Sequence, residues 1–500
     1  MLIGHTSELH PKIKPLESFH TRDERCWKHI LGWMNECTLK NPACHRSNSL
    51  AEPGNWPSRF IAVGDTGSPI IKLCQTVTLD LSTTRYMTLS HCWGKFVPTS
   101  LLKRNLSSFL AGIAIDDLPK TFREAVEVTR KLSIRFLWID SLCIIQDSTD
   151  DWTIESSKMY HIYKNTYLNI AAAISENATG GLFYPRSPLF IGPCVFEIGK
   201  TRKKRAMVEP SGTDDSQMLL TRAWVFQDWL LASRTILFGK ELRWECNELK
   251  ASETLPDLES VYQNISPFRR KNMRGDWVNL HKKDDAQRWV VWNSIIDEYS
   301  QKELTIFSDK LVALSGLSSE LGKVWDGVNY LAGHWSYRFL RTLLWSTKKN
   351  GPQHTAYTTP SWSWAAIDGS IKTPKEDELS DCLIESMEAK VRPREPLNPY
   401  GCISDGYFRL QGPLLCVTII KDNNARWDAV LLGRDLLEKG EGGPMIQGKI
   451  PINITWDKKG SEELILSAKV HLAPCEVFLM EHGDGLSLQG LILEPTYLKT

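Results

Sequence analysis

The sequence has little that would direct it to a membrane, to secretion or to nucleic acid. No apolar run in its 500 residues approaches the ~20 residues of a membrane-spanning helix. The opening MLIGHTSELHPKIK lacks the apolar segment of a signal peptide, so we expect a cytoplasmic protein. Lysine and arginine number 60 against 59 aspartate and glutamate, a formal net charge of +1. A nearly neutral chain without a basic domain predicts no nucleic-acid binding.

Two kinds of local signature are also missing. No GxGxxG or GxxxxGK[ST] loop follows a predicted strand, so no phosphate-cradling turn is predicted. The 12 cysteines are spread from Cys26 to Cys475, which favours free, mostly buried thiols in a reducing compartment. Cys37, Cys44 and His45 are close in sequence but do not complete a four-ligand zinc pattern, so we predict no metal site.

Apolar residues, by contrast, are plentiful, at 42% of the chain, and tryptophan is abundant, with 19 copies. Such a chain can bury a sizeable core, and its length suits about two to four structural units. We predict that most tryptophans pack in the core or between units, because each one buries a large apolar area.

Strands and helices alternate after residue 85. Continuous apolar runs at 86–90, 136–139 and 167–174 predict strands that are buried on both faces. Helical periodicity separates them, as in the spacing of Phe122, Ala125, Val126, Thr129 and Leu132. The order strand, helix, strand, helix, strand predicts a doubly wound, mostly parallel α/β sheet with right-handed connections.

Flanking segments complete the predicted organisation. We expect a helical lead-in over residues 1–50 and an α/β domain over 51–246 that begins with a β-hairpin, formed by 59–63 and 71–81. A mainly helical region over 247–350 and a β-rich unit over 351–500 follow. Alternating apolar residues near the C-terminus, such as Leu486, Leu488 and Ile492, favour a small β-sandwich or barrel there.

Polar residues follow the first two strands of the predicted sheet. Ser90, His91 and Trp93 come at the end of the first strand, and Asp140 and Cys143 follow the second. Ligands of doubly wound sheets bind beyond the carboxyl ends of the strands, so these side chains are candidates for one pocket. The alternative is that they are turn and capping residues. A further interpretation is a nucleophilic Cys92 or Cys143 with His91 as the base and Asp140 orienting it, although no local signature supports it.

Glu155 shares a predicted helical face with Trp152 and Met159. A carboxylate on an apolar face is costly unless it is paired or lines a cavity. Burial beside a tryptophan would raise its pKa, which suits a general acid or base. The alternative is a buried ion pair with an arginine: Arg123, Arg222 or Arg234.

Three motifs resemble those of the heterokaryon-incompatibility (HET) domain family. They are Tyr86–Gly94 (YMTLSHCWG), Leu137–Asp147 (LWIDSLCIIQD) and Arg222–Asp228 (RAWVFQD), which stand in the family order within a motif core over 86–233. The chain departs from the family pattern at three positions. Asp228 replaces the usual glutamate, Ser133 a common glycine, and Asn41 a common histidine.

The resemblance implies a role in fungal non-self recognition, where fusion of unlike strains triggers programmed cell death. It implies action through protein partners or self-association. HET domains are similar to Toll/interleukin-1 receptor (TIR) domains, which have a flavodoxin-like fold. Some TIR domains cleave NAD with a glutamate in a Trp-Cys-x-x-Glu context, and Trp152–Glu155 here lacks the cysteine.

Two alternatives to association therefore stay open. One is a TIR-like NAD glycohydrolase that uses Glu155, with NAD as its substrate and no certain cofactor. The other is a protein of unassigned role that is associated with a biosynthetic gene cluster.

Overall fold

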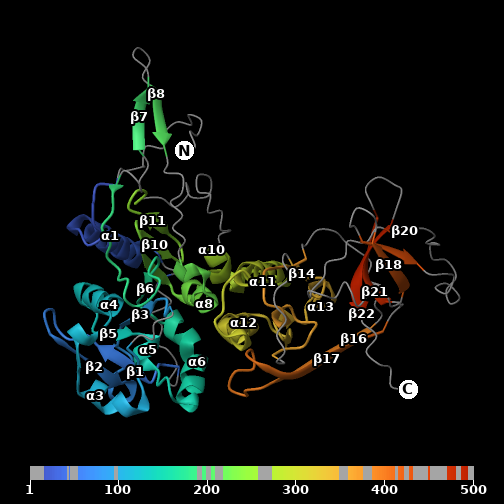
Figure 1. Ribbon diagram of the computed structural model, residues 1–500, viewed down its shortest axis with the longest axis horizontal. Coiled ribbons are helices and arrows are strands. Elements are labelled where there is room, and N and C mark those ends of the chain that lie inside the picture. The colour runs from blue at the N-terminus through green and yellow to red at the C-terminus, as the bar shows by residue number, and fades with distance from the viewer. Residues whose placement is uncertain are drawn as a thin grey trace. The chain divides into compact units, whose positions relative to one another are not determined.

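The computed structural model divides the chain into two compact units, residues 1–279 and 280–500 (Figure 1). The structure describes residues 16–41, 44, 55–94, 99–188, 194–198, 204–208, 218–256, 273–347, 358–374, 386–411, 415–421, 427–431, 449–450, 470–479 and 486–493. His45, one of the residues considered for a metal site, lies outside these ranges.

The first unit is built on a mixed nine-stranded sheet. Four parallel strands form its centre, in the order β5 (Phe136–Trp138), β3 (Tyr86–Ser90), β6 (Leu168–Ala172) and β9 (Arg234–Phe238). Antiparallel strands extend it beyond β5 with β1 (Arg59–Ala62), β2 (Ile70–Gln75) and β4 (Ile113–Ala114). Beyond β9 the sheet continues with β10 (Leu242–Cys246) and β11 (Lys250–Ser252).

Every residue of the four central strands is buried, as expected for strands that are covered on both faces. The helix α4 (Lys120–Lys131) connects β3 to β5, and α6 (Thr149–Lys164) lies between β5 and β6. Because β5 and β6 flank β3 on opposite sides, right-handed connections place α4 and α6 on opposite faces (Figure 1). The predicted α/β architecture is confirmed at this level.

Three local features differ from the sequence-based expectation. The second strand of the hairpin ends at Gln75, because Thr76 begins a 3-10 turn whose hydroxyl donates to the Pro57 carbonyl. The segment after β5 is a short helix, α5 (Asp140–Cys143), where we expected a loop. A two-stranded antiparallel sheet, β7 (Cys194–Ile198) with β8 (Lys204–Val208), lies in a stretch without a clear strand pattern.

The helix α1 (Glu24–Lys40) belongs to the first unit and packs against β10. Its N-terminus is capped by the Asp23 side chain, which accepts from the Arg25 N–H. Its buried face includes Trp27, Ile30 and Trp33, and the Trp33 ring lies 6.5 Å from that of Trp244 on β10. The described part of this unit also contains the helices α3 (Leu106–Ala111), α8 (Ala223–Leu231) and α10 (Met273–Val278).

The second unit combines helices with several small sheets. Its helices are α11 (Asp285–Tyr299), α12 (Ser315–Val324) and α13 (Phe339–Thr342). Its two-stranded sheets pair β12 (Tyr330–Leu331) with β13 (His334–Trp335), β14 (Ser346–Thr347) with β15 (Ile371–Lys372), and β16 (Ser386–Pro393) with β17 (Ile403–Gln411). A five-stranded sheet has the order β20 (Lys449–Ile450), β19 (Trp427–Leu431), β18 (Leu415–Lys421), β21 (Val470–Leu479) and β22 (Leu486–Leu493). The β-rich character of the C-terminal region is confirmed.

Tryptophans form much of the core of the second unit. Those with almost no exposed surface are Trp289, Trp292, Trp325, Trp335 and Trp364. The indole N–H groups of Trp292 and Trp364 both donate to the Gly333 carbonyl, at 3.1 and 3.0 Å. Core packing, as predicted from composition, is confirmed for these five. No helix among the described residues is long and apolar enough to cross a bilayer.

Candidate functional site

The ends of β3 and β5 meet at one edge of the sheet, because the two strands are parallel neighbours with Tyr86 paired to Phe136. The Trp93 indole N–H donates to Asp140 Oδ2 at 2.9 Å. His91 Nδ1 lies 3.8 Å from Asp140 Oδ1. The structure thus brings together four of the six candidate residues, counting Ser90 at the end of β3.

A buried polar cluster lies beside these residues, under α6 and α8. It consists of Ser90, Tyr163, Asn169 and Asp228, and we call it the Asp228 cluster. Ser90 Oγ lies 3.3 Å from Asp228 Oδ2 and 3.2 Å from Asn169 Oδ1. The Tyr163 hydroxyl is hydrogen-bonded to Asp228 and to Ser90. Each member is at most 4% exposed.

Burial shifts the pKa values of Asp228 and His91 in the directions that favour their uncharged forms. Loss of hydration raises the pKa of the Asp228 carboxyl well above its usual range, and the nearby Asp140 carboxylate raises it further. Burial also lowers the pKa of His91, against the opposing effect of Asp140. Both shifts favour the uncharged forms, a protonated carboxyl group and a neutral imidazole, which together can donate and accept protons.

Several buried polar atoms here have no hydrogen-bond partner within the described part of the chain. They are Asp228 Oδ1, both ring nitrogens of His91, and Ser141 Oγ. Buried polar atoms are normally paired, so these atoms are free to bind water or a ligand. Trp93 and Asp140 are only half-buried and form the part of the site nearest to solvent.

Glu155 lies in a different network. Its side chain has no exposed surface and accepts from the Ser58 N–H at 3.1 Å, the Ser58 hydroxyl at 2.6 Å and Lys158 Nζ at 3.0 Å. The ion-pair partner is thus Lys158 rather than one of the three arginines considered from the sequence. Trp152, expected to bury beside the acid, is 38% exposed. Among the described residues, the hydrogen-bond partners of Glu155 are Ser58 and Lys158, and neither Ser90 nor Asp140 is one of them.

Cys143 and Glu155 are both bound by residues at the start of β1: Arg59 contacts the Cys143 carbonyl, and Ser58 contacts Glu155. Arg59 Nε donates to the Cys143 carbonyl at 2.7 Å, and its Nη2 binds both Asp151 oxygens at 2.6 and 2.5 Å. Burial raises the pKa of the Cys143 thiol, which makes it a poor nucleophile. These contacts fix the start of β1 to α5 and α6.

Tyr163, Asn169 and Asp228 were not singled out from the sequence as site residues. The sequence nevertheless contains a feature that could have indicated Asn169 and Asp228. Asn169 is a polar residue inside an otherwise apolar buried strand, and Asp228 ends the third motif. A separate hollow of about 520 Å³ opens in the second unit between residues 300–304 and 368–370, and no candidate residue lines it.

Tyr163 of α6 and Asp228 of α8 thus lie beside Ser90 at the end of β3, within a parallel α/β centre. Residues 86–228 match the family model of the heterokaryon incompatibility protein (HET). These residues therefore form a heterokaryon-incompatibility (HET) domain, as the motifs within them predicted. The matched stretch runs from the first residue of β3 to Asp228 and so contains both the Asp228 cluster and Glu155. No curated protein and no solved structure matched the chain.

Proposed function

We propose that this protein acts in non-self recognition and cell death signalling, and that its HET domain works by associating with further copies of the chain. The proposal rests on the burial of the Glu155 side chain and on its contacts. The carboxylate is sealed and paired with Ser58 and Lys158, which supports a structural role rather than catalysis. Association needs no catalytic glutamate at this position.

The topology of the parallel strands supports the resemblance to TIR domains. In chain order β3, β5, β6 and β9 are the first to fourth parallel strands, so their spatial order is 2-1-3-4. Flavodoxin-like sheets begin with the same order. A likeness of fold does not establish an activity. We therefore infer only self-association from the resemblance to TIR domains.

Trp152 and Ile154 supply a surface on which association can be tested. They are 38% and 45% exposed, and both lie in the first half of α6 within the family stretch. Large exposed apolar side chains favour burial against a partner.

The test is expression of the full chain in a fungal host, with growth arrest as the readout and cross-linking as the measure of association. The Trp152→Ser/Ile154→Ser variant is expected to lose arrest and cross-linking together. Thr153→Ala on the same helix is the matched control, and Glu155→Gln is expected to keep both properties. Loss of arrest in Glu155→Gln with folding and association unchanged would contradict the proposal.

A second candidate is hydrolysis of NAD, the substrate that the TIR resemblance implies. The unpartnered Asp228 Oδ1 and His91 nitrogens favour it, because they can bind a polar substrate. In this version Asp228 replaces Glu155 as the acidic residue. Purified protein incubated with NAD would release nicotinamide, and Asp228→Asn would reduce the rate by at least about tenfold. Absence of nicotinamide at every protein concentration, including conditions of association, would exclude this candidate.

A further inference from the structure

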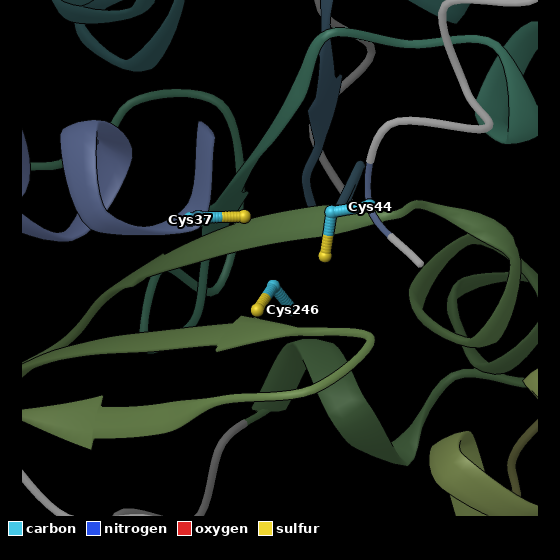
Figure 2. Close-up of side chains that lie close together, drawn as sticks. All are labelled: Cys37, Cys44 and Cys246. Carbon is cyan, nitrogen blue, oxygen red and sulfur yellow. The ribbon is translucent and has the colours of Figure 1, made fainter. Parts of the chain in front are cut away.

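Three cysteine thiols meet in the first unit, outside the site described above. Cys37 lies in the last turns of α1, Cys44 follows that helix, and Cys246 ends β10. Their sulfur atoms all lie within 4.8 Å of one another, and Figure 2 shows the three side chains close together. All three residues are buried, and none forms a disulfide.

N–H groups donate to two of the three sulfur atoms, those of Cys37 and Cys246, whereas Cys44 Sγ lies 3.9 Å from the Ser233 carbonyl oxygen. The Leu249 N–H donates to Cys246 Sγ at 3.2 Å, and Asn41 Nδ2 donates to the same sulfur at 3.4 Å. Arg234 Nε donates to Cys37 Sγ at 3.2 Å. A neutral thiol is a weak acceptor, whereas metal-bound thiolates are commonly held by such outer donors. The surroundings therefore suit thiolates better than thiols.

The charge balance leads to the same conclusion. Arg234 is fully buried, and its Nη1 and Nη2 atoms donate to the carbonyls of Tyr167 and Cys44, respectively. No carboxylate of the described residues forms an ion pair with it. A buried cation needs a compensating anion. Three thiolates around a divalent ion leave one net negative charge, which Arg234 neutralises.

We propose that Cys37, Cys44 and Cys246 form a structural zinc site with three thiolate ligands and a water molecule in the fourth position. Thiolates select soft ions such as zinc. Tetrahedral zinc with Zn–S bonds of about 2.3 Å needs sulfurs about 3.8 Å apart, so the observed spacing requires only a small inward movement. Each thiol releases its proton to solvent as the ion binds. The ion would tie α1, which precedes the family stretch, to β10, which follows it.

The test is the metal content of the full-length protein, purified without chelators and measured by elemental and native mass spectrometry. We expect one zinc per chain. Cys37→Ser, Cys44→Ser and Cys246→Ser should each reduce it at least tenfold. Cys92→Ala is the matched control, because Cys92 is also buried in the first unit but packs with apolar residues such as Val225 and Leu237. It should retain the zinc.

A second measurement covers variants that fail to fold. Wild-type protein stripped of metal and reloaded with Co²⁺ should show thiolate-to-cobalt charge-transfer absorption, which only sulfur ligands produce. The proposal is overturned if the folded wild-type chain contains no metal and cannot be loaded. It is equally overturned if two of the three cysteines are joined in a disulfide, or if iron or copper occupies the site in place of zinc.

Discussion

Asp228 couples the protonation of the candidate site to folding. Its pKa is raised in the folded protein, so the folded state binds this proton more tightly than the unfolded state does. The stabilisation is complete below the ordinary pKa of about 3.9 and is lost as the pH rises through the folded value. Asp228→Asn cannot ionise and should be more stable than wild type at pH 8 by at least about 1 kcal/mol, with little difference at pH 4. Urea denaturation at both pH values measures this, and an equal difference at both would contradict it.

Glu155 should contribute to stability rather than to chemistry. Glu155→Ala leaves the Ser58 N–H and hydroxyl and the Lys158 ammonium without their acceptor, so the free energy of unfolding should fall by about 2–4 kcal/mol. Glu155→Gln keeps one acceptor oxygen and should cost less. Chemical denaturation of the two variants checks the order. A cost below about 0.5 kcal/mol for the alanine variant would show that the network is dispensable.

Sequence spacing predicted the burial of Glu155 but not its partner. Ser58 stands 97 positions earlier, before β1, and it reaches α6 through the pairing of β1 with β5 and the contacts of Arg59 to α5 and α6. The same limit applies to the cysteine trio. The sequence places Cys37 close to Cys44, but it does not predict that Cys246 joins them. That contact depends on the packing of β10 against α1. Long-range partners of this kind depend on sheet order, which hydropathy does not encode.

At the scale of elements, the C-terminus of α4 is strained at a single residue. Ser133 has a φ of +57°, and the Ser133 and Ile134 N–H groups bond back to the Arg130 and Thr129 carbonyls, which is a Schellman motif. Glycine is preferred in this conformation, and the family commonly has glycine here. Ser133→Gly should therefore raise the free energy of unfolding by about 1 kcal/mol. Ser133→Val should lower it, and thermal denaturation of the pair tests both signs.

The central elements were predictable because each carries a strong local pattern. The runs that form β3, β5 and β6 are wholly apolar or small apart from Thr88, Ser90 and Asn169, and α4 has a regular apolar face. The short helix α5 was missed because four residues are too few to show a helical period. The end of β2 was misplaced because Thr76 to Thr78 have β-forming side chains, and the turn depends on a tertiary contact to Pro57.

The whole molecule should unfold in two steps, since each unit has its own core. Gly333 has a φ of +93°, and a Cβ there would come within 2.7 Å of Trp364 Nε1. Gly333→Ala should destabilise the second unit by about 2–4 kcal/mol and leave the first unit unchanged. Asp228→Asn should affect only the first. Differential scanning calorimetry of the full chain separates the transitions, and a single transition moved by both variants would contradict this picture.

The packing of α1 against β10 also constrains how the protein is made. During translation the helix leaves the ribosome long before its partner strand is synthesised. At about 5–20 residues per second, Trp33 is synthesised on the order of ten seconds or more before its partner Trp244. Throughout that interval the nascent chain presents an uncovered tryptophan-rich helix. We therefore expect the N-terminal region to be a target for chaperones that bind exposed apolar segments until β10 is synthesised.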